Sequence, residues 1–284
     1  MDAIVHSFLM IGQSNMAGRG FIKEVKQIYD ENIKMLVNGR WQTMTEPINY
    51  DRPTSGIGLA ASFAGAWRLK NPQQQIGLIP CAEGGSGLDD WAVDGALFRN
   101  AVFQAKAAQR ISVIDGILWH QGENDSFAGR SLVYLEKLTA IIKALREELN
   151  VPVIPLLAGG LGDFLGGGRY GKYFTEYTLV NRALIDFAAK NAHTYFVSAA
   201  DLNANADGLH FDALSQRKFG IRYFEAYSSL QNVFAPLAEE DRLVEVIANR
   251  RLSKTELSAL LEIKFAGGSI PLDEYEYQLA LLSD

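Results

Sequence analysis

Four short segments of this sequence bring together serine, histidine, acidic and amide side chains, each beside glycine. They read "GQSNM" (residues 12–16), "GGSG" (84–87), "WHQGEND" (119–125) and "DGLH" (207–210). A serine hydroxyl is weakly nucleophilic until a base accepts its proton, and histidine is the side chain best suited to that role at neutral pH. If the four segments lie together, they therefore indicate nucleophilic catalysis by serine.

Three residues of these segments fit the parts of such a site. Ser14 is the candidate nucleophile and His210 the candidate base. A carboxylate is needed to hold the imidazole in the right tautomer and to stabilise its charged form. Asp207 lies three residues before His210, and Gly208 between them permits a tight turn that brings the carboxylate back to the ring. The sequence therefore predicts a triad of Ser14, His210 and Asp207.

The negative charge that develops on the substrate during acyl transfer needs hydrogen-bond donors placed in advance. One candidate donor is the backbone N–H of Ser14, at the start of a helix. A second is a backbone N–H of Gly84 or Gly85, where the absence of side chains lets a substrate approach closely. The third is a side-chain amide, from either Gln121 or Asn124.

Alternating strand and helix patterns explain how the four segments come together. Apolar runs predict strands at residues 3–11, 76–82, 113–120, 151–159 and 194–199, and the stretches between them predict helices at 58–70, 96–110, 130–149, 176–191 and 213–230. This alternation indicates an α/β fold with a five-stranded parallel sheet in the flavodoxin-like order 2-1-3-4-5 and helices on both faces. The four segments follow strands one, two, three and five, so we expect them at the edge of the sheet where the strands end.

Three other segments depart from this pattern. Residues 37–56 and 159–174 are predicted as long loops, and loops of this length in a compact domain are usually functional or mobile. Residues 235–284 contain no strand signal and are predicted as short helices. We therefore expect a catalytic domain at residues 1–234 and a small helical appendage after it. The appendage either packs on that domain or joins subunits into a homo-oligomer.

The composition argues against several classes of function. The chain of 284 residues has a net charge of -6 and no long basic run, which argues against nucleic acid or an anionic membrane as a partner. Its single cysteine, Cys81, allows no internal disulfide, and the chain has no CxxC or HExxH spacing for a metal. No apolar stretch reaches the roughly 20 residues of a membrane span. Residues 3–11 also lack the flanks of a signal peptide, so we expect no metal, no membrane contact and a cytoplasmic location.

The same four segments resemble the four sequence blocks of the SGNH (GDSL-type) hydrolases. The glutamine in "GQSN" and the form "HQGE" are similar to the sialate O-acetylesterase and acetylxylan esterase branch, carbohydrate esterase family six, over residues 3–230. The resemblance implies a three-layer flavodoxin-like fold. It also implies a serine esterase that removes acetyl groups from a carbohydrate, of the sialic acid or xylan type, through an acyl-enzyme and without a cofactor. Hydrolysis of another ester class and carbohydrate binding without catalysis are the alternatives.

The resemblance also implies roles for individual residues. It supports the triad named above, and it maps Gly85 and Gln121 to the oxyanion-hole positions, with Asn124 as the alternative amide. Glu123 is the alternative acidic member of the triad.

Three more residues are candidates for the neighbourhood of the site. His120 directly follows a strand and is expected to orient the third segment or to line the site. Trp91 lies just after "GLDD" and is expected to stack on a sugar ring, with core packing as the alternative. Arg52 lies in the first long loop and is expected to reach the substrate.

Overall fold

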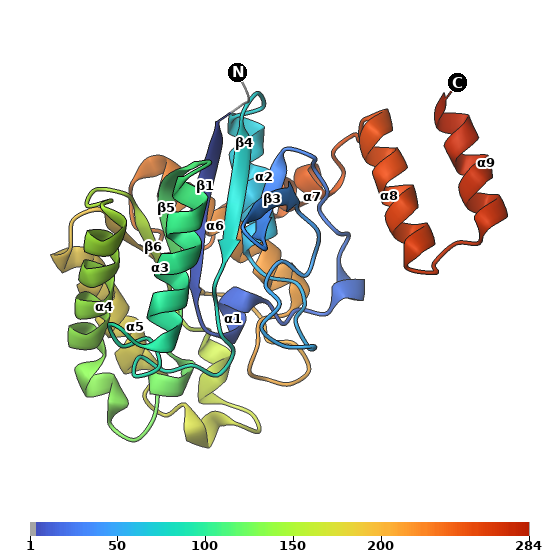
Figure 1. Ribbon diagram of the computed structural model, residues 1–284. Coiled ribbons are helices and arrows are strands. Elements are labelled where there is room, and N and C mark those ends of the chain that lie inside the picture. The colour runs from blue at the N-terminus through green and yellow to red at the C-terminus, as the bar shows by residue number, and fades with distance from the viewer. Residues whose placement is uncertain (1–3, 284) are drawn as a thin grey trace.

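The protein is built around a mixed sheet, which a computed structural model describes within residues 4–283 (Figure 1). Parallel strands follow one another in the order β4-β1-β5-β6-β7: β1 (Val5–Gly12), β4 (Gln75–Pro80), β5 (Val113–His120), β6 (Leu156–Gly159) and β7 (Thr194–Val197). These are the five predicted strands in the predicted order, which is confirmed. The fourth strand begins at Leu156, so the prediction of a strand is wrong for residues 151–155, which form turns. Ala3, the first residue of the first predicted strand, lies outside the described residues.

Two further strands extend the sheet beyond β4, and sequence analysis missed both. β2 (Ile33–Val37) pairs in parallel with β4, and β3 (Arg40–Thr43) pairs antiparallel with β2. The prediction of a loop that begins at residue 37 is therefore wrong for residues 37–43. Asn38 and Gly39 join the two strands at positive φ, 51° and 73°. An Asn-Gly pair is a strong hairpin signal, but both strands are short and carry few fully buried side chains, so their apolar pattern is weak.

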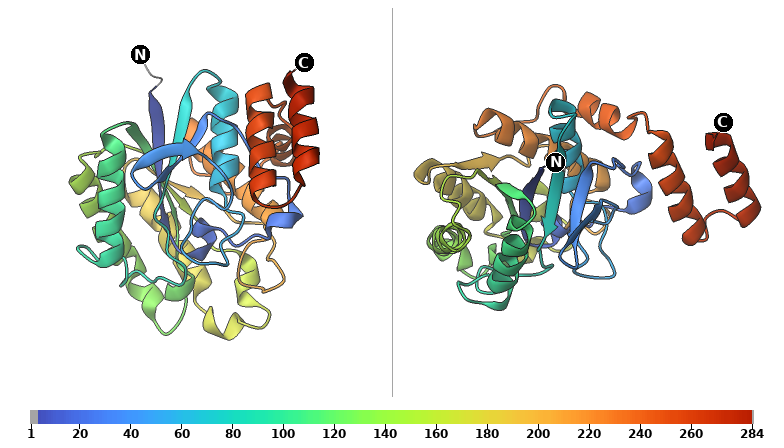
Figure 2. Two further views of the ribbon diagram at one scale, coloured as in Figure 1. Left: turned by 45° about the vertical axis from the view of Figure 1, so that its right-hand side comes forward. Right: turned by 45° about the horizontal axis from the view of Figure 1, so that its top comes forward.

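Helices cover both faces of the sheet, which gives the expected three layers (Figures 1 and 2). On one face lie α2 (Ala60–Lys70) and α6 (Ala213–Ser229), which pack against each other. On the other face lie α3 (Ala96–Gln109), α4 (Tyr134–Leu149) and α5 (Tyr177–Lys190), with α4 in contact with both its neighbours. The sequence predicted each of these helices, with ends that differ by a few residues.

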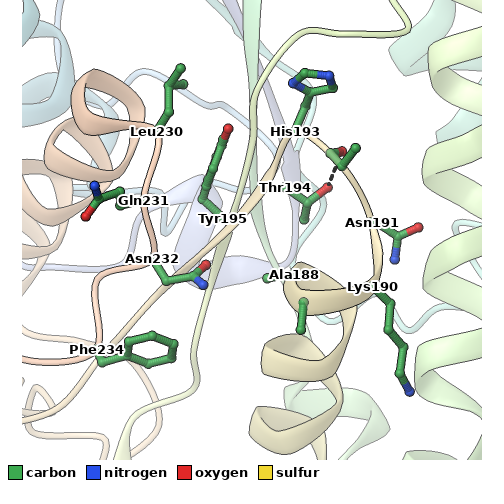
Figure 3. Close-up of a pocket in the computed structure, with 12 residues that line it drawn as sticks. Ala188, Lys190, Asn191, His193, Thr194, Tyr195, Leu230, Gln231, Asn232 and Phe234 are labelled. Carbon is green, nitrogen blue, oxygen red and sulfur yellow. Dashed lines mark hydrogen bonds between the residues drawn. The ribbon is translucent and has the colours of Figure 1, made fainter.

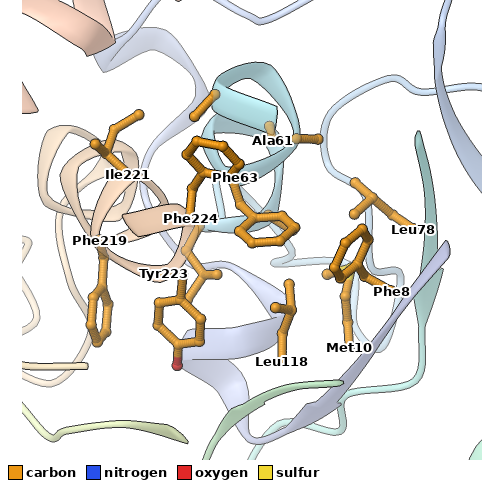
Figure 4. Packing of buried hydrophobic residues seen from close by; sticks show 14 of the residues in the cluster. Phe8, Met10, Ala61, Phe63, Leu78, Leu118, Phe219, Ile221, Tyr223 and Phe224 are labelled. Atoms are coloured by element: carbon orange, nitrogen blue, oxygen red, sulfur yellow. The ribbon is translucent and has the colours of Figure 1, made fainter. Parts of the chain in front are cut away.

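Alternate side chains of β1 point into the two cores between the sheet and the helices. Phe8 and Met10 belong to the core under α2 and α6, whereas Leu9 and Ile11 belong to the core under α3, α4 and α5. The ring of Phe8 meets that of Phe63 edge-on, with 4.8 Å between centroids, and Figure 4 shows these rings packed above the sheet. Because β1 is buried on both faces and paired along both edges, it holds the residues that follow it in a fixed place.

The sheet ends in β3 on one side and in β7 on the other. Along the outer edge of β7, the N–H of Val233 donates to the carbonyl oxygen of Phe196 (2.8 Å), and the N–H of Ser198 donates to that of Val233 (2.8 Å). The chain after α6 therefore covers β7. On the opposite side, the short strand β3 carries the exposed side chains of Arg40 and Gln42.

Short helical turns shape the loops between the longer elements. α1 (Ser14–Ala17) is a single turn that directly follows β1. Turns of 3₁₀ helix lie at Ile22–Glu24, Glu123–Asp125, Arg130–Val133, Asp163–Gly166 and Gly171–Tyr173. The last two fall within the predicted loop at residues 159–174.

Within the described residues, the C-terminal segment folds into three helices, α7 (Glu240–Ala248), α8 (Lys254–Ala266) and α9 (Leu272–Ser283). Helix α7 packs on α2 and α6, and its Ile247 is buried in their core. Helices α8 and α9 form a hairpin that projects from the body of the protein (Figures 1 and 2). The division of the chain after residue 234 stays a prediction.

The hairpin of α8 and α9 leaves several apolar side chains in solvent. They are Leu257, Ile263, Phe265, Leu272, Tyr277 and Leu281. They are between 36% and 66% exposed, although the ring of Phe265 stacks on that of Tyr275. Association of subunits through this surface stays a prediction.

A buried ion pair between α6 and α7 indicates where the chain can be shortened. Arg222 is completely buried, and its Nε and Nη2 donate to the Glu240 carboxylate at 2.7 and 2.8 Å. Removing one partner of such a pair leaves an uncompensated buried charge, so Glu240→Ala is expected to lower the free energy of unfolding by roughly 3–5 kcal/mol. Urea unfolding measures this loss, with the exposed Glu245→Ala on the same helix as control.

Shortening the chain after Pro236 removes Glu240 and is expected to destabilise the protein in the same way. Shortening it after Leu252 removes only the hairpin and keeps the ion pair. Equal stability of Glu240→Ala and Glu245→Ala would contradict a structural role for this pair.

Candidate active site

Ser14 lies at the carboxyl edge of the sheet, at the first position of α1. β1 ends at Gly12, whose φ is 135° and where a Cβ atom would lie 2.0 Å from the carbonyl oxygen of His120. Only glycine fits there, so the ends of β1 and β5 approach closely, and the N–H of Gln13 donates to the same carbonyl (2.8 Å). Close packing therefore fixes the segment that carries Ser14 against the segment that follows β5.

Ser14, His210 and Asp207 form a continuous chain of hydrogen bonds. The Oγ atom of Ser14 lies 2.9 Å from Nε2 of His210, and Nδ1 of His210 lies 2.6 Å from Oδ2 of Asp207. With Nδ1–H donating to the carboxylate, Nε2 is free to accept from the serine hydroxyl. The side chain of His210 is 15% exposed and that of Asp207 is 40% exposed. The structure thus brings together the three side chains of the predicted triad.

The turn that carries Asp207 and His210 is held by its own backbone. The second carboxylate oxygen of Asp207, Oδ1, accepts from the N–H groups of Leu209 (2.8 Å) and His210 (2.9 Å). Gly208 has a φ of 69°, in the left-handed region that glycine adopts without strain. Burial acts to raise the pKa of Asp207, but these hydrogen bonds and the one from the His210 ring outweigh it and hold the pKa below its usual value. The carboxylate therefore stays charged at neutral pH.

The loop after β4 also contributes residues to the candidate site. Gly85 has a φ of 81°, and its N–H, like that of Ser14, donates no hydrogen bond within the described residues. The N–H of Gly84 donates to Oδ2 of Asp51 (2.9 Å). A Cβ atom on Gly84 would lie 2.5 Å from the guanidinium of Arg19 and 2.7 Å from the carboxylate of Asp51. A larger residue would therefore displace the ion pair between Arg19 and Asp51.

Asp51 holds this loop through several hydrogen bonds. Its carboxylate accepts from the guanidinium of Arg19, from the hydroxyl of Ser55 (2.9 Å) and from the N–H of Gly84. Burial acts to raise the pKa of Asp51, but the hydrogen bonds and positive charge of Arg19, with the bonds from Ser55 and Gly84, outweigh it and lower the pKa. The charged carboxylate therefore stabilises the fold above the ordinary aspartate pKa of about 3.9. That contribution is lost as the pH falls through the lowered folded-state value.

Asp51→Asn is accordingly expected to lower the Tm at neutral pH, with a difference from the wild type that shrinks as the pH falls below about 4. The asparagine keeps the shape of the side chain but lacks the charge that pairs with Arg19. Thermal unfolding at neutral and acidic pH measures the difference, and Asp94→Asn, at an exposed position, is the control. A difference that stays constant over this pH range would contradict the lowered pKa.

The two candidate amides after β5 lie in different environments. Gln121 is completely buried, and its Nε2 donates to Oδ2 of Asp125 (2.6 Å) and to the carbonyl oxygen of Ser86 (3.2 Å). Its N–H groups are already used, which disagrees with the prediction that Gln121 lines the oxyanion hole. Asn124 is half-buried, its backbone N–H donates to Oε1 of Gln13 (3.3 Å), and its Nδ2 donates to no described residue. Asn124 is therefore the amide with a free donor.

Glu123 and His120 lie beneath the site. Glu123 is 1% exposed, and its Oε1 accepts from Nδ2 of Asn15 (2.6 Å), whereas it makes no hydrogen bond with His210. His120 is completely buried, and its Nε2 bonds to the carbonyl oxygen of Gly160 (3.1 Å). Burial lowers the pKa of His120, so its ring is neutral at neutral pH. His120 therefore packs under the third segment and does not line the site.

The two predicted sugar-binding residues differ in exposure. Trp91 is 1% exposed, and its Nε1–H donates to Oγ of Ser86 (2.9 Å). The prediction that Trp91 stacks on a sugar is wrong, because its ring packs edge-on against Trp119 in the core. Arg52 is 55% exposed, and its Nη2 donates to the carbonyl oxygen of Gly84 (2.6 Å), which places it at the rim of the site.

Sequence reasoning missed several residues that hold the site together, among them Asn15, Arg19 and Asn205. Oδ1 of Asn15 accepts from the N–H of Phe211 (3.0 Å). Asn205 donates from Nδ2 to the carbonyl oxygen of Arg19 (3.1 Å) and accepts at Oδ1 from the N–H of Asp207 (2.9 Å). Asn15 lies in the first segment and Arg19 three residues after it, so their place in or next to that segment was the available signal. The signal at Asn205 was its type, because asparagine side chains often bond the backbone two residues on in turns.

A surface cavity of about 720 Å³ lies away from these residues (Figure 3). Its lining includes Lys190, His193 and Thr194, at the end of α5 and the start of β7. Because the strands are parallel, the start of β7 lies at the opposite edge of the sheet from Ser14, and the cavity contains none of the four segments. Within residues 4–283, no group of three His, Cys, Asp or Glu side chains could hold a metal ion, and no helix has the length and apolar character to cross a membrane.

Comparison with known proteins gives relatives with the same architecture. The chain is 28% identical over 244 residues to a probable carbohydrate esterase of Arabidopsis thaliana, across 78% of this chain and 90% of that protein. The solved structure of the Arabidopsis protein has a TM-score of 0.70 at 27% identity and covers 79% of this chain and 98% of its own. The structure of NanS has a TM-score of 0.64 at 16% identity, with 80% and 98% covered. A carbohydrate acetylesterase from Xanthomonas citri has a TM-score of 0.59 at 19% identity, with 78% and 55% covered. At these last two identities the likeness shows the fold alone.

A family model described as a carbohydrate esterase, sialic acid-specific acetylesterase, matches residues 5–229. That span contains all four segments, the sheet and the five helices that cover it. The resemblance noted in the sequence is therefore confirmed: the chain belongs to the sialic acid-specific acetylesterase family of SGNH-type carbohydrate esterases and is a carboxylic ester hydrolase.

Proposed function

We propose that the protein removes O-acetyl groups from a carbohydrate through an acetyl-enzyme formed on Ser14. The observation that carries the proposal is the chain of hydrogen bonds from Ser14 through His210 to Asp207, at 2.9 and 2.6 Å. Nucleophile and base lie within hydrogen-bond reach, and a third group orients the base, which is the geometry that an activated serine needs. The family supplies the substrate class, an acetylated carbohydrate.

In the first step, Oγ of Ser14 attacks the carbonyl carbon of the acetyl ester while Nε2 of His210 takes the hydroxyl proton. The new C–O bond converts the carbonyl oxygen into an oxyanion. Asp207 accepts from Nδ1–H throughout and stabilises the positive charge that the imidazole acquires. Its lowered pKa keeps it charged for this task.

We assign the oxyanion hole to three donors: the backbone N–H groups of Ser14 and Gly85, and Nδ2 of Asn124. Each of them is free of other hydrogen bonds within the described part of the chain. Donors fixed before the reaction stabilise the developing charge without reorganisation, and this effect is usually a large part of the rate enhancement.

The intermediate then collapses and the C–O bond to the sugar breaks. His210 returns its proton to the departing sugar oxygen, which leaves as a hydroxyl. In the second half of the reaction, a water molecule gives a proton to Nε2 of His210 and attacks the acetyl-enzyme. Collapse of that intermediate releases acetate and restores Ser14 with its proton.

Acetate release from three substrates tests this function. An aryl acetate reports the serine chemistry, and O-acetylated sialic acid and acetylated xylan report the carbohydrate class. We expect turnover of the aryl acetate and of at least one of the two carbohydrates. Arg52, which is exposed at the rim of the site, is the residue that we expect to contact the sugar. Turnover of the aryl acetate alone would reject the carbohydrate class, and sugar binding without any acetate release would show a protein that binds carbohydrate but does not hydrolyse it.

Asn124→Ala is expected to lower kcat by roughly 10²–10³-fold with little change in KM, because it removes a donor that acts on the transition state. The comparison variant is Gln121→Ala. Its amide bonds Asp125 and Ser86 in the interior, so we expect that change to lower the Tm. Steady-state kinetics and thermal unfolding of both variants give the measurement. A loss of kcat confined to Gln121→Ala would return the donor role to Gln121.

A further inference from the structure

Glu123 is a buried carboxylate that the proposed mechanism does not use. It is 1% exposed, and among the described residues neither lysine nor arginine pairs with it. Within residues 4–283, its Oε2 has no hydrogen-bond partner, and neither does Nδ1 of His120, which lies 3.8 Å from Oε1. Burying an ionisable group with unmet hydrogen bonds costs free energy, so stability does not explain this side chain.

The hydrogen bond that Glu123 makes leads toward the candidate triad. Its Oε1 accepts from Nδ2 of Asn15 (2.6 Å), the residue after Ser14. Oδ1 of the same amide accepts from the N–H of Phe211 (3.0 Å), the residue after His210. The side-chain amide of Asn15 therefore connects the segment of the nucleophile with the segment of the base. Asn15 and Phe211 are 196 residues apart in the chain.

The carboxylate of Glu123 determines which way this amide faces. An amide has a donor end and an acceptor end, whereas an ionised carboxylate only accepts. The NH₂ group of Asn15 must therefore face Glu123, which leaves its oxygen toward the N–H of Phe211. With the amide reversed, two acceptors would meet on one side and two donors on the other.

We propose that Glu123 is a positioning residue, which acts through Asn15 to set the separation and angle between Oγ of Ser14 and Nε2 of His210. The inference rests on the proposed function, since it concerns the same nucleophile and base. A positioning role depends on the pairing of a donor with an acceptor between residues 15 and 123. A role in proton transfer, or as the acidic member of the triad, would require a carboxylate at residue 123 itself.

Exchanging donor and acceptor between the two positions separates these roles. Asn15→Asp sets two carboxylates against each other and is expected to lower kcat on the order of 10²-fold with little change in KM, the scale of a 1 Å misplacement of reacting groups. Adding Glu123→Gln restores the pair in the opposite sense. The introduced amide donates to the introduced carboxylate, whose second oxygen accepts from Phe211. We expect the double variant to recover kcat roughly tenfold over Asn15→Asp.

Asn181→Asp is the matched control. The amide of Asn181 bonds both the N–H and the carbonyl oxygen of Leu161 (2.7 and 3.0 Å) and makes no hydrogen bond to the triad. We expect this variant to lower the Tm and to leave kcat unchanged. A double variant no faster than Asn15→Asp would overturn the proposal, because residue 123 would then need its charge.

If Asn15→Asp fails to fold, a comparison of Glu123→Gln with Glu123→Ala tests whether Glu123 acts by positioning Asn15. Glutamine keeps an oxygen for the NH₂ group of Asn15 and alanine does not, so kcat is expected to stay near the wild-type value for glutamine and to fall for alanine. Equal losses in the two variants would overturn the proposal.

The wild type is measured first. A wild type that neither releases acetate nor reacts at Ser14 with a fluorophosphonate rejects the proposed function. An active wild type whose exchanged pair is not rescued rejects the positioning role alone.

Discussion

Ser14→Ala is expected to lower kcat for acetyl ester hydrolysis on the order of 10⁶-fold, the scale seen when the nucleophile of a serine triad is removed. The hydroxyl is the group that forms the acetyl-enzyme, and no other serine hydroxyl among the described residues bonds to His210. The lost hydrogen bond is expected to cost only about 1 kcal/mol of stability. Acetate release and thermal unfolding of the same preparation separate the two effects.

Covalent labelling gives an independent measure of the same prediction. A fluorophosphonate is expected to modify Ser14 of the wild type and to leave Ser14→Ala unmodified, as read by mass spectrometry of the intact protein. Ser228→Ala, at an exposed position, is the control and is expected to be labelled like the wild type. Wild-type turnover by Ser14→Ala would end the proposal of a serine esterase.

Asp207→Asn is expected to lower kcat by roughly 10⁴-fold, because it disturbs the tautomer of His210. The asparagine has one acceptor oxygen, whereas the carboxylate serves the His210 ring with Oδ2 and two backbone N–H groups with Oδ1. An NH₂ group placed beside Nδ1 forces that nitrogen to accept and moves the proton to Nε2. Nε2 can then no longer take the proton of Ser14.

Glu123→Gln is the comparison for this prediction, because Glu123 was the alternative acid. It bonds to Asn15 and not to His210, so its loss of charge is expected to cost far less in kcat. Steady-state kinetics with an aryl acetate measures both variants. A larger loss in Glu123→Gln than in Asp207→Asn would show that the acid of the triad has been assigned to the wrong residue.

The architecture was predictable from the sequence because its signal is local. Long apolar runs such as residues 113–120 predict buried parallel strands, and the order of strands and helices then constrains their arrangement. The hairpin of β2 and β3 was missed because its strands are short and half-exposed, so the Asn38–Gly39 turn was the stronger signal. The parallel strands placed the four segments at one edge, which is why the triad could be predicted before its geometry was known.

The errors at the site share one physical cause: a residue's type does not reveal its burial or its distant partners. Trp91 has the chemistry of a sugar platform but lies in the core beside Trp119. Gln121 has the donor that an oxyanion hole needs, but that donor is taken by Ser86 and Asp125. Contacts of this kind depend on how the chain folds back on itself, and a pattern of residue types does not contain them.

The edges of the sheet bear on whether the folded protein can polymerise. A strand with unpaired N–H and C=O groups is a template for sheet growth between molecules, and natural proteins protect against it with short, charged or covered edges. Here residues 232 and 233 already bond along β7, and β3 offers four residues with the charged Arg40 exposed. Among the described residues, intermolecular strand addition therefore finds no long free edge, so aggregation through the sheet is expected to require at least partial unfolding.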